Sequence, residues 1–280
     1  KSYFMGFMLP LLILIIIVNF SASLVPSFQI YGKEDLAKHE QRTLNYIKEH
    51  NLISYWAHPE ASDHHEFTYL NQNFRVQTEP YPHLLKNTYG YNGFGGVYQD
   101  RTTLTDPGSE WDQILIRELN NKTITPVWCF GEMLYHHEGQ AGKKLGDVET
   151  VVWANEKTSD AILDSIRKGY FYARVNHGNQ KLILQEWQAR WNPNGTDVSL
   201  FATSNTGPEP VRILLISNGT VIKDILTNTP IALEFNHEHS YPKAYYRAVI
   251  TGQHPLKLVT NPIFSTMPNH KESPIKRLTD

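Results

Sequence analysis

Two short apolar stretches in this chain each lead into a loop that is rich in histidine and acidic residues. Residues 53–57 end in His58-Pro59, and residues 125–130 lead to Glu132. Proline cannot donate a ladder hydrogen bond, so Pro59 ends the first strand and His58 is the last residue that the sheet holds. In α/β barrels the active site is built from loops at one face. The repeated pattern therefore predicts an α/β fold with one site formed by both strand exits.

The side chains in these loops predict a metal site with nitrogen and oxygen ligands. The only cysteine, Cys129, excludes an intramolecular disulfide and a cluster of zinc-binding thiolates. Imidazoles and carboxylates remain as the donors for a divalent metal. The candidates are His58, Glu60, Asp63, His64 and His65 after the first stretch and Glu132, His136 and His137 after the second. A surface loop that is acidic and histidine-rich is the alternative interpretation.

Composition narrows the class of protein. A length of 280 residues suits one large domain, or one medium domain and a small one. The formal net charge of −2 gives no electrostatic footprint for nucleic acid. The chain has 15 Tyr, 6 Trp and 13 His, which favours a pocket enzyme or a sugar-binding protein.

The N-terminal segment, residues 1–24, is strongly apolar. Residues 3–20 carry no charge and are followed by small residues, as in a secretory signal or a membrane anchor. Either would place the protein outside the cytoplasm or on a membrane, with membrane contact through residues 3–20. The alternative is a pair of buried strands split near Pro10, in a cytoplasmic protein.

Helical and strand patterns alternate up to about residue 180. Helices are predicted over residues 33–50, 83–88, 109–120 and 158–168, with short strands between them. The four glycines of residues 89–98 indicate a tight turn and a close backbone approach. From residue 181 to 268 short alternating stretches predict antiparallel strands, and Asn218-Gly219 predicts a hairpin turn. Residues 269–280 are expected to form a loose tail.

Several stretches in this order resemble the PHP (polymerase and histidinol phosphatase) superfamily of metallohydrolases, in its multi-domain branch. They are Y-W-A-H-P-E at 55–60, W-D-Q-I-L at 111–115, V-W-C-F-G-E at 127–132, the segment 154–174, and T-N-P-I-F at 260–264. The resemblance implies a partial, distorted (β/α)7 barrel, similar to a TIM barrel, over residues 25–180, followed by a small antiparallel β subdomain. It also implies one or more divalent ions (Zn, Mn or Fe) and hydrolysis of a small phosphoester or related ester. By position His58 and His136 are the implied metal ligands, with Glu132 beside them.

The chain also departs from the family pattern. Leu134 stands where an aspartate ligand is expected, the glutamate usual near residue 95 is absent, and no His-x-His precedes His58. A catalytically degenerate, envelope-associated binding protein is therefore the alternative function, and no catalytic residue is assigned. Arg174 is a candidate for holding a substrate phosphate, or else forms a structural ion pair. The His-x-His at 237–239 is expected in a solvated turn.

Overall fold

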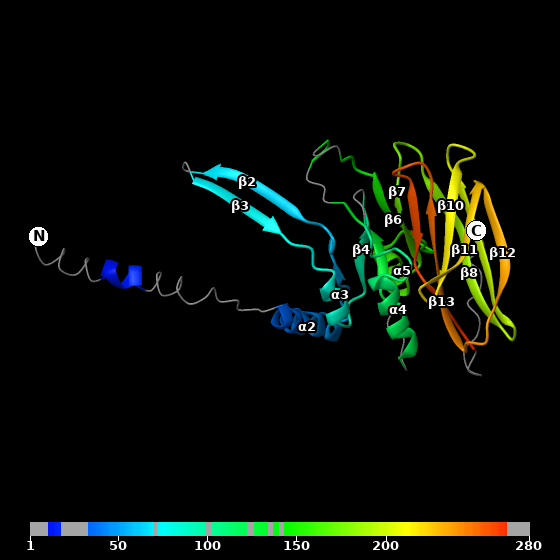
Figure 1. Ribbon diagram of the computed structural model, residues 1–280, viewed down its shortest axis with the longest axis horizontal. Coiled ribbons are helices and arrows are strands. Elements are labelled where there is room, and N and C mark those ends of the chain that lie inside the picture. The colour runs from blue at the N-terminus through cyan, green and yellow to red at the C-terminus, as the bar shows by residue number, and fades with distance from the viewer. Residues whose placement is uncertain are drawn as a thin grey trace, which may run out of the picture.

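The computed structural model of the chain describes residues 11–17, 33–69, 72–98, 102–121, 126–133, 137–139 and 143–267. The helical residues 11–17 and one hairpin lie at the same end of a body made mainly of β-sheets (Figure 1). Residues 11–17 are helical and all seven side chains are exposed, so buried strands do not form over these residues. Within the described residues, no helix is both long and apolar enough to span a membrane.

The elements follow one another as α2 (Lys33–Glu49), β1 (Tyr55–Trp56), β2 (Asp63–Tyr69), β3 (Gln72–Thr78), α3 (His83–Asn87), β4 (Gly93–Val97), α4 (Glu110–Asn120), β5 (Trp128–Gly131), β6 (Val148–Val152), α5 (Ser159–Lys168), β7 (Phe171–Val175), β8 (Leu182–Asn192), β9 (Gly195–Ser204), β10 (Pro210–Ser217), β11 (Thr220–Asn228), β12 (Ile231–Glu238), β13 (Lys243–Thr251), β14 (Lys257–Thr260) and β15 (Ile263–Thr266).

A parallel sheet in the order β1-β4-β5 carries the exits of the two apolar stretches. Every residue of β4 is buried, because it is the central strand. The apolar residues of α4 recur at helical spacing and pack against this sheet. Phe94 of β4 meets Trp111 of α4 with 5.5 Å between ring centroids. The carboxyl ends of β1, β4 and β5 therefore share one edge.

A larger antiparallel sheet has the order β11-β10-β13-β14-β7-β6, with β15 also pairing with β13. A third sheet, β12-β9-β8, is antiparallel as well. Residues from both sheets form a second core, which includes Leu184, Leu200, Ile213 and Ile250. The alternating stretches predicted after residue 181 thus form strands.

The predicted (β/α)7 barrel is wrong. Parallel pairing stops at β5, and β6 and β7 pair antiparallel with each other and with the C-terminal strands. The contact between β6 and β5 explains why no further parallel strand is added. The hydroxyl of Thr150 accepts from the N–H of Gly131 (3.0 Å) and donates to its carbonyl (2.8 Å), so a side chain satisfies the edge groups that a next parallel strand would use. Because β7 pairs with β14, one sheet also crosses the expected boundary at residues 180/181.

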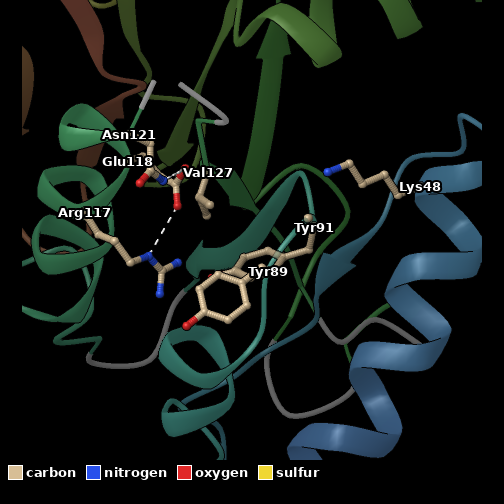
Figure 2. A pocket seen from close by; sticks show the side chains of 8 residues that line it. Lys48, Tyr89, Tyr91, Arg117, Glu118, Asn121 and Val127 are labelled. Carbon is tan, nitrogen blue, oxygen red and sulfur yellow. Dashed lines mark hydrogen bonds and ion pairs between the residues drawn. The ribbon is translucent and has the colours of Figure 1, made fainter. Parts of the chain in front are cut away.

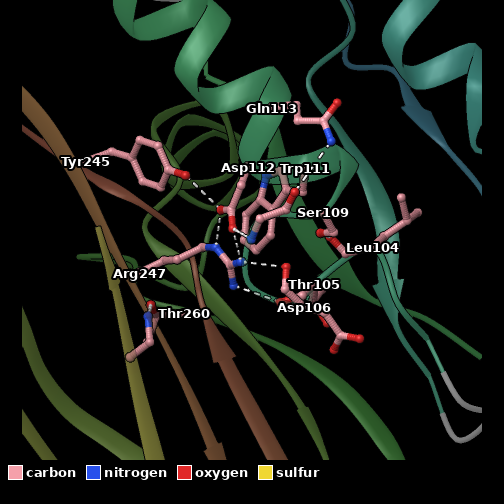
Figure 3. A network of polar contacts seen from close by, with 12 residues as sticks. Leu104, Thr105, Asp106, Ser109, Trp111, Asp112, Gln113, Tyr245, Arg247 and Thr260 are labelled. Atoms are coloured by element: carbon pink, nitrogen blue, oxygen red, sulfur yellow. Dashed lines mark hydrogen bonds and ion pairs between the residues drawn. The ribbon is translucent and has the colours of Figure 1, made fainter. Parts of the chain in front are cut away.

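A buried ion pair joins the parallel half to the larger sheet (Figure 3). Asp112 of α4 and Arg247 of β13 have no exposed side-chain surface, and Nη2 lies 2.7 Å from Oδ2. Arg247 also donates to the carbonyls of Thr105 and Asp106, and the Tyr245 hydroxyl donates to Asp112. These contacts fix the loop after β4 against β13.

Asn261, between β14 and β15, makes a second connection. Its side chain accepts from the N–H of Cys129 in β5 (2.8 Å) and donates to the carbonyl of Phe171 in β7 (3.0 Å). Its own carbonyl accepts from the indole of Trp187 in β8. One buried residue thus ties the parallel sheet to both antiparallel sheets.

Candidate functional site

The exits of β1 and β5 meet at the carboxyl edge of the parallel sheet. Nδ1 of His58 lies 2.7 Å from Oε1 of Glu132, and the two side chains are 21% and 11% exposed. The backbone N–H of His58 donates to the same carboxylate oxygen. Two residues that the sequence singled out for their positions after apolar strands are therefore in contact.

Glycine on the central strand makes this contact possible. β4 separates β1 from β5, so the two side chains must reach across it. A Cβ built on Gly95 would lie 1.6 Å from Oε1 of Glu132. The close approach that the glycine run predicts is therefore made by the carboxylate of Glu132, in the space that a side chain at position 95 would fill.

Two tyrosines lie beside the pair. The hydroxyl of Tyr81 donates to the carbonyl of Ala57, just before His58. Burial raises the pKa of Tyr81, and the nearby charge of Glu132 adds to this effect. The ring of Tyr98 meets that of His58 edge-on at 5.7 Å. Sequence analysis missed Tyr81, because no local motif identifies it and its contact with Ala57 appears only in the folded chain.

The other proposed ligands of the first loop lie apart from the pair. The carboxylate of Glu60 accepts from the backbone N–H groups of Thr103 and Leu104, at 2.9–3.0 Å, and orders the loop after β4. His64 is exposed on β2, where it contacts Glu66 at 3.0 Å. Asp63 and His65 also belong to β2, and their side chains lie outside the described residues.

The second loop is described only in part. His137 is exposed, and His136 lies outside the described residues. Within the described residues, no three His, Cys, Asp or Glu side chains come together in a group that could hold a metal ion. His58 and Glu132 have the donor types that divalent metals take, but the described residues supply no third ligand beside them.

The hydrogen bond to Glu132 determines which nitrogen of His58 can act. A carboxylate at Nδ1 accepts the proton of that nitrogen and leaves the lone pair on Nε2. Histidines that bind metals commonly have a carboxylate behind the other nitrogen, and a general base needs the same tautomer. The pair can therefore present one oriented imidazole nitrogen to a metal or to a water molecule.

Arg174 takes part in a structural ion pair. Its guanidinium lies 2.6 Å from Glu149, and it donates to the carbonyl of Leu182 within the antiparallel sheet. Burial alone would raise the pKa of Glu149, but hydrogen bonds from Asn176, Lys181 and Arg174 outweigh it and hold that pKa at about 2. The geometry matches the ion-pair alternative for Arg174.

The histidines at 237–239 do not lie in a solvated turn. His237 belongs to β12, and its Nδ1 lies 2.9 Å from the hydroxyl of Tyr246. Nε2 of His239 lies 2.9 Å from the hydroxyl of Thr196. Both imidazoles therefore have structural partners in the antiparallel half.

A small polar pocket lies at the opposite, amino edge of the parallel sheet (Figure 2). Arg117 of α4 lies 4.6 Å above the ring of Tyr89 and contacts Glu118 at 3.3 Å. Lys48, at the end of α2, is the second basic residue that lines the pocket. No motif marks these residues, which come from three distant segments, so sequence analysis missed them.

No protein-family model matches this chain, and neither a curated protein nor a solved structure matches it.

Proposed function

We propose that the protein hydrolyses phosphoester or related ester bonds of a small molecule at the carboxyl edge of its parallel sheet. The observation that carries the proposal is the contact of 2.7 Å between His58 and Glu132 across Gly95. The ordered motifs at 55–60 and 127–132 support kinship with the PHP metallohydrolases, whose chemistry this would be. The proposal does not need a barrel, because three parallel strands already bring both loops to one edge.

The roles follow from the geometry of the pair. Glu132 holds the proton on Nδ1 of His58 and fixes the orientation of the ring, so that Nε2 faces the reacting water or its metal. A divalent ion (Zn, Mn or Fe), when bound, would lower the pKa of a coordinated water and neutralise charge on the phosphoryl oxygens. His136 is the further ligand that the family resemblance implies. Tyr81 shields the pair on the side of β1 through its hydrogen bond to Ala57.

The full chain, dialysed against a chelator, would be assayed with bis(p-nitrophenyl) phosphate and p-nitrophenyl acetate, with and without added Mn²⁺ or Zn²⁺. Bound metal would be measured separately by elemental analysis. We expect turnover that needs metal and is lost in His58→Ala. Glu132→Gln should lose about 10–100-fold in metal affinity or activity. His64→Ala, which changes an exposed histidine, is the matched control and should keep full activity. The proposal would be excluded if the unmodified chain showed no bound metal and no turnover.

Gly95→Ala separates the geometry from the chemistry. A methyl group at this position displaces the carboxylate of Glu132 and leaves both side chains of the pair in the protein. We expect the same fall in activity as in Glu132→Gln, because in both variants the imidazole of His58 loses the carboxylate that orients it. Full activity of Gly95→Ala would show that the contact has no part in turnover.

A metal-free binding protein is the second candidate, because the described residues bring only two possible ligands together. Its binding site would be the pocket of Figure 2, where Lys48 and Arg117 suit a small anion and Tyr89 suits an aromatic ring. In that case bis(p-nitrophenyl) phosphate would bind without being hydrolysed and would raise the melting temperature of the protein. The rise would disappear in Arg117→Ala and persist in His58→Ala.

A further inference from the structure

The hairpin β2–β3 stands away from the body (Figure 1). One of its two faces is aromatic. Phe67 pairs with Phe74 across the hairpin, and their rings stack at 5.4 Å with an interplanar angle of 16°. Both rings remain exposed, by 52% and 44%, and Tyr69 is exposed by 62%. The three side chains share a face because residues two apart on a strand, and directly paired residues, point the same way.

The opposite face of the hairpin is polar and has its own contacts. His64 contacts Glu66 and Arg75, at 3.0 and 3.3 Å, and Thr68 donates to Asn73 at 2.8 Å. The hairpin is thus amphipathic, and its strands pair only with each other within the described residues. A hairpin of two strands is marginally stable in water unless something covers its apolar face.

The helical residues 11–17 indicate what covers it. Seven successive aliphatic side chains make nearly two helical turns, so they point in every direction around the axis. Each is 41–57% exposed. Helices that are apolar on all sides are buried in a protein core or in a membrane. A protein groove would cover only one side of this helix, whereas the hydrocarbon of a lipid bilayer would contact every side. This segment and the hairpin project from the same end of the molecule (Figure 1).

We propose that the aromatic face of β2–β3 is a membrane-contact surface, which lies in the interface of a lipid bilayer beside the apolar segment 11–17. Phe and Tyr suit this position, because Tyr is enriched at the boundary between hydrocarbon and headgroups and Phe is common on the apolar face of interfacial elements. The polar face, with His64, Glu66 and Arg75, then remains in water. Recognition is by apolar burial, so binding persists at high ionic strength. The inference is independent of the proposed hydrolysis.

Site-specific labels test the hairpin separately from residues 11–17. The only native cysteine, Cys129, is 1% exposed, so a thiol-reactive nitrobenzoxadiazole dye reports an introduced cysteine. Phe67→Cys places the dye on the aromatic face, and Thr68→Cys, one residue further along the same strand, places it on the polar face. Each labelled full chain is mixed with phosphatidylcholine vesicles, with and without lipids that carry a quencher in their acyl chains.

We expect a severalfold rise and a blue shift of emission at position 67, with strong quenching by the acyl-chain quencher, and little change at position 68. Equal responses at the two positions, or none at either while the chain still floats with vesicles, would overturn the proposal. A change at position 67 that needs no vesicles and accompanies a doubled mass in sedimentation would assign the face to a second copy of the chain. As a second measurement, Phe67→Ser/Phe74→Ser should lower vesicle partitioning roughly tenfold or more, whereas Thr68→Ser/Asn73→Ser should not. Circular dichroism of both variants checks that the body remains folded.

Discussion

Two ion pairs of similar geometry in this protein lie in opposite environments. Asp112 and Arg247 are completely buried, with N–O distances of 2.7 Å, whereas Asp224 and Arg212 are about half exposed, with distances of 2.7 and 2.8 Å. The buried carboxylate also accepts from Tyr245 and from the N–H of Gly108. Environment therefore decides how much each pair contributes to stability.

We expect Asp112→Ala to lower the free energy of unfolding by about 3–5 kcal/mol, because it leaves the guanidinium of Arg247 buried without its partner. The matched change Asp224→Ala should have a much smaller effect, since water solvates Arg212. Urea denaturation of both variants measures the difference. Equal losses would contradict a specific role for the buried pair.

Glu149 makes the stability of the fold depend on pH. Its folded-state pKa of about 2 lies below the ordinary value of 4.5, so its contribution is complete above about pH 4.5 and is lost as the pH falls toward 2. Glu149→Gln should therefore destabilise the protein at pH 7, by about 1–2 kcal/mol when its 27% exposure is considered. Melting curves of both proteins should converge between pH 4.5 and 2. A difference that does not depend on pH would contradict this assignment.

Sequence reasoning found part of the candidate site. His58 and Glu132 could be identified because each follows an apolar strand, which is a local pattern. The contribution of Gly95 required the register of three strands, and that of Tyr81 required the return of the chain from the hairpin. Such contacts depend on which distant strands pair, and a single sequence does not reveal this.

Among the elements, the turn between β10 and β11 follows its sequence closely. Asn218 and Gly219 have positive φ angles of 48° and 79°, as the two central residues of a type I′ turn require. We expect Gly219→Ala to lower the free energy of unfolding by about 1 kcal/mol, because a residue with a Cβ is strained at a positive φ. The nearest atom to the added Cβ is 3.4 Å away, so a steric clash adds little to this cost. Asn218→Asp, which tolerates the positive φ and keeps the oxygen that accepts from the N–H of Tyr245, should be nearly neutral. Chemical denaturation tests both, and an equally stable Gly219→Ala would show that the turn adopts another conformation.

Helices could be predicted with good bounds because their signals are local. For α5, the hydroxyl of Thr158 accepts from the N–H of Ala161, and Gly169 ends the helix with a φ of 74°. The hairpin β2–β3 was missed, since its polar and charged residues mask the alternation. The barrel failed for a different reason: short apolar strands fit parallel and antiparallel sheets alike, and Thr150 selects the second at the edge of β5.

At the scale of the whole molecule, the larger sheet includes strands from both sides of residue 180. β7 pairs with β14 and β6 pairs with β7, so residues 25–180 alone would leave the inner edge of β7 without a partner. We expect the full chain to unfold in one calorimetric transition and the fragment 25–180 to lack stable structure. Circular dichroism and limited proteolysis of the fragment check this. Two separate transitions, or a folded fragment, would instead support independent domains.

The position of Asn261 has a consequence for the order of events on the ribosome. The amide of Cys129 finds its acceptor 132 residues later in the chain, and Asp112 meets Arg247 after 135 residues. When His58 and Glu132 have both been synthesised, the nascent chain still lacks Arg247 and Asn261, which hold the parallel sheet in place. The carboxyl edge of the parallel sheet is thus held in place only after Arg247 and Asn261 have been synthesised, and the apolar strands made earlier remain open to chaperones during that interval.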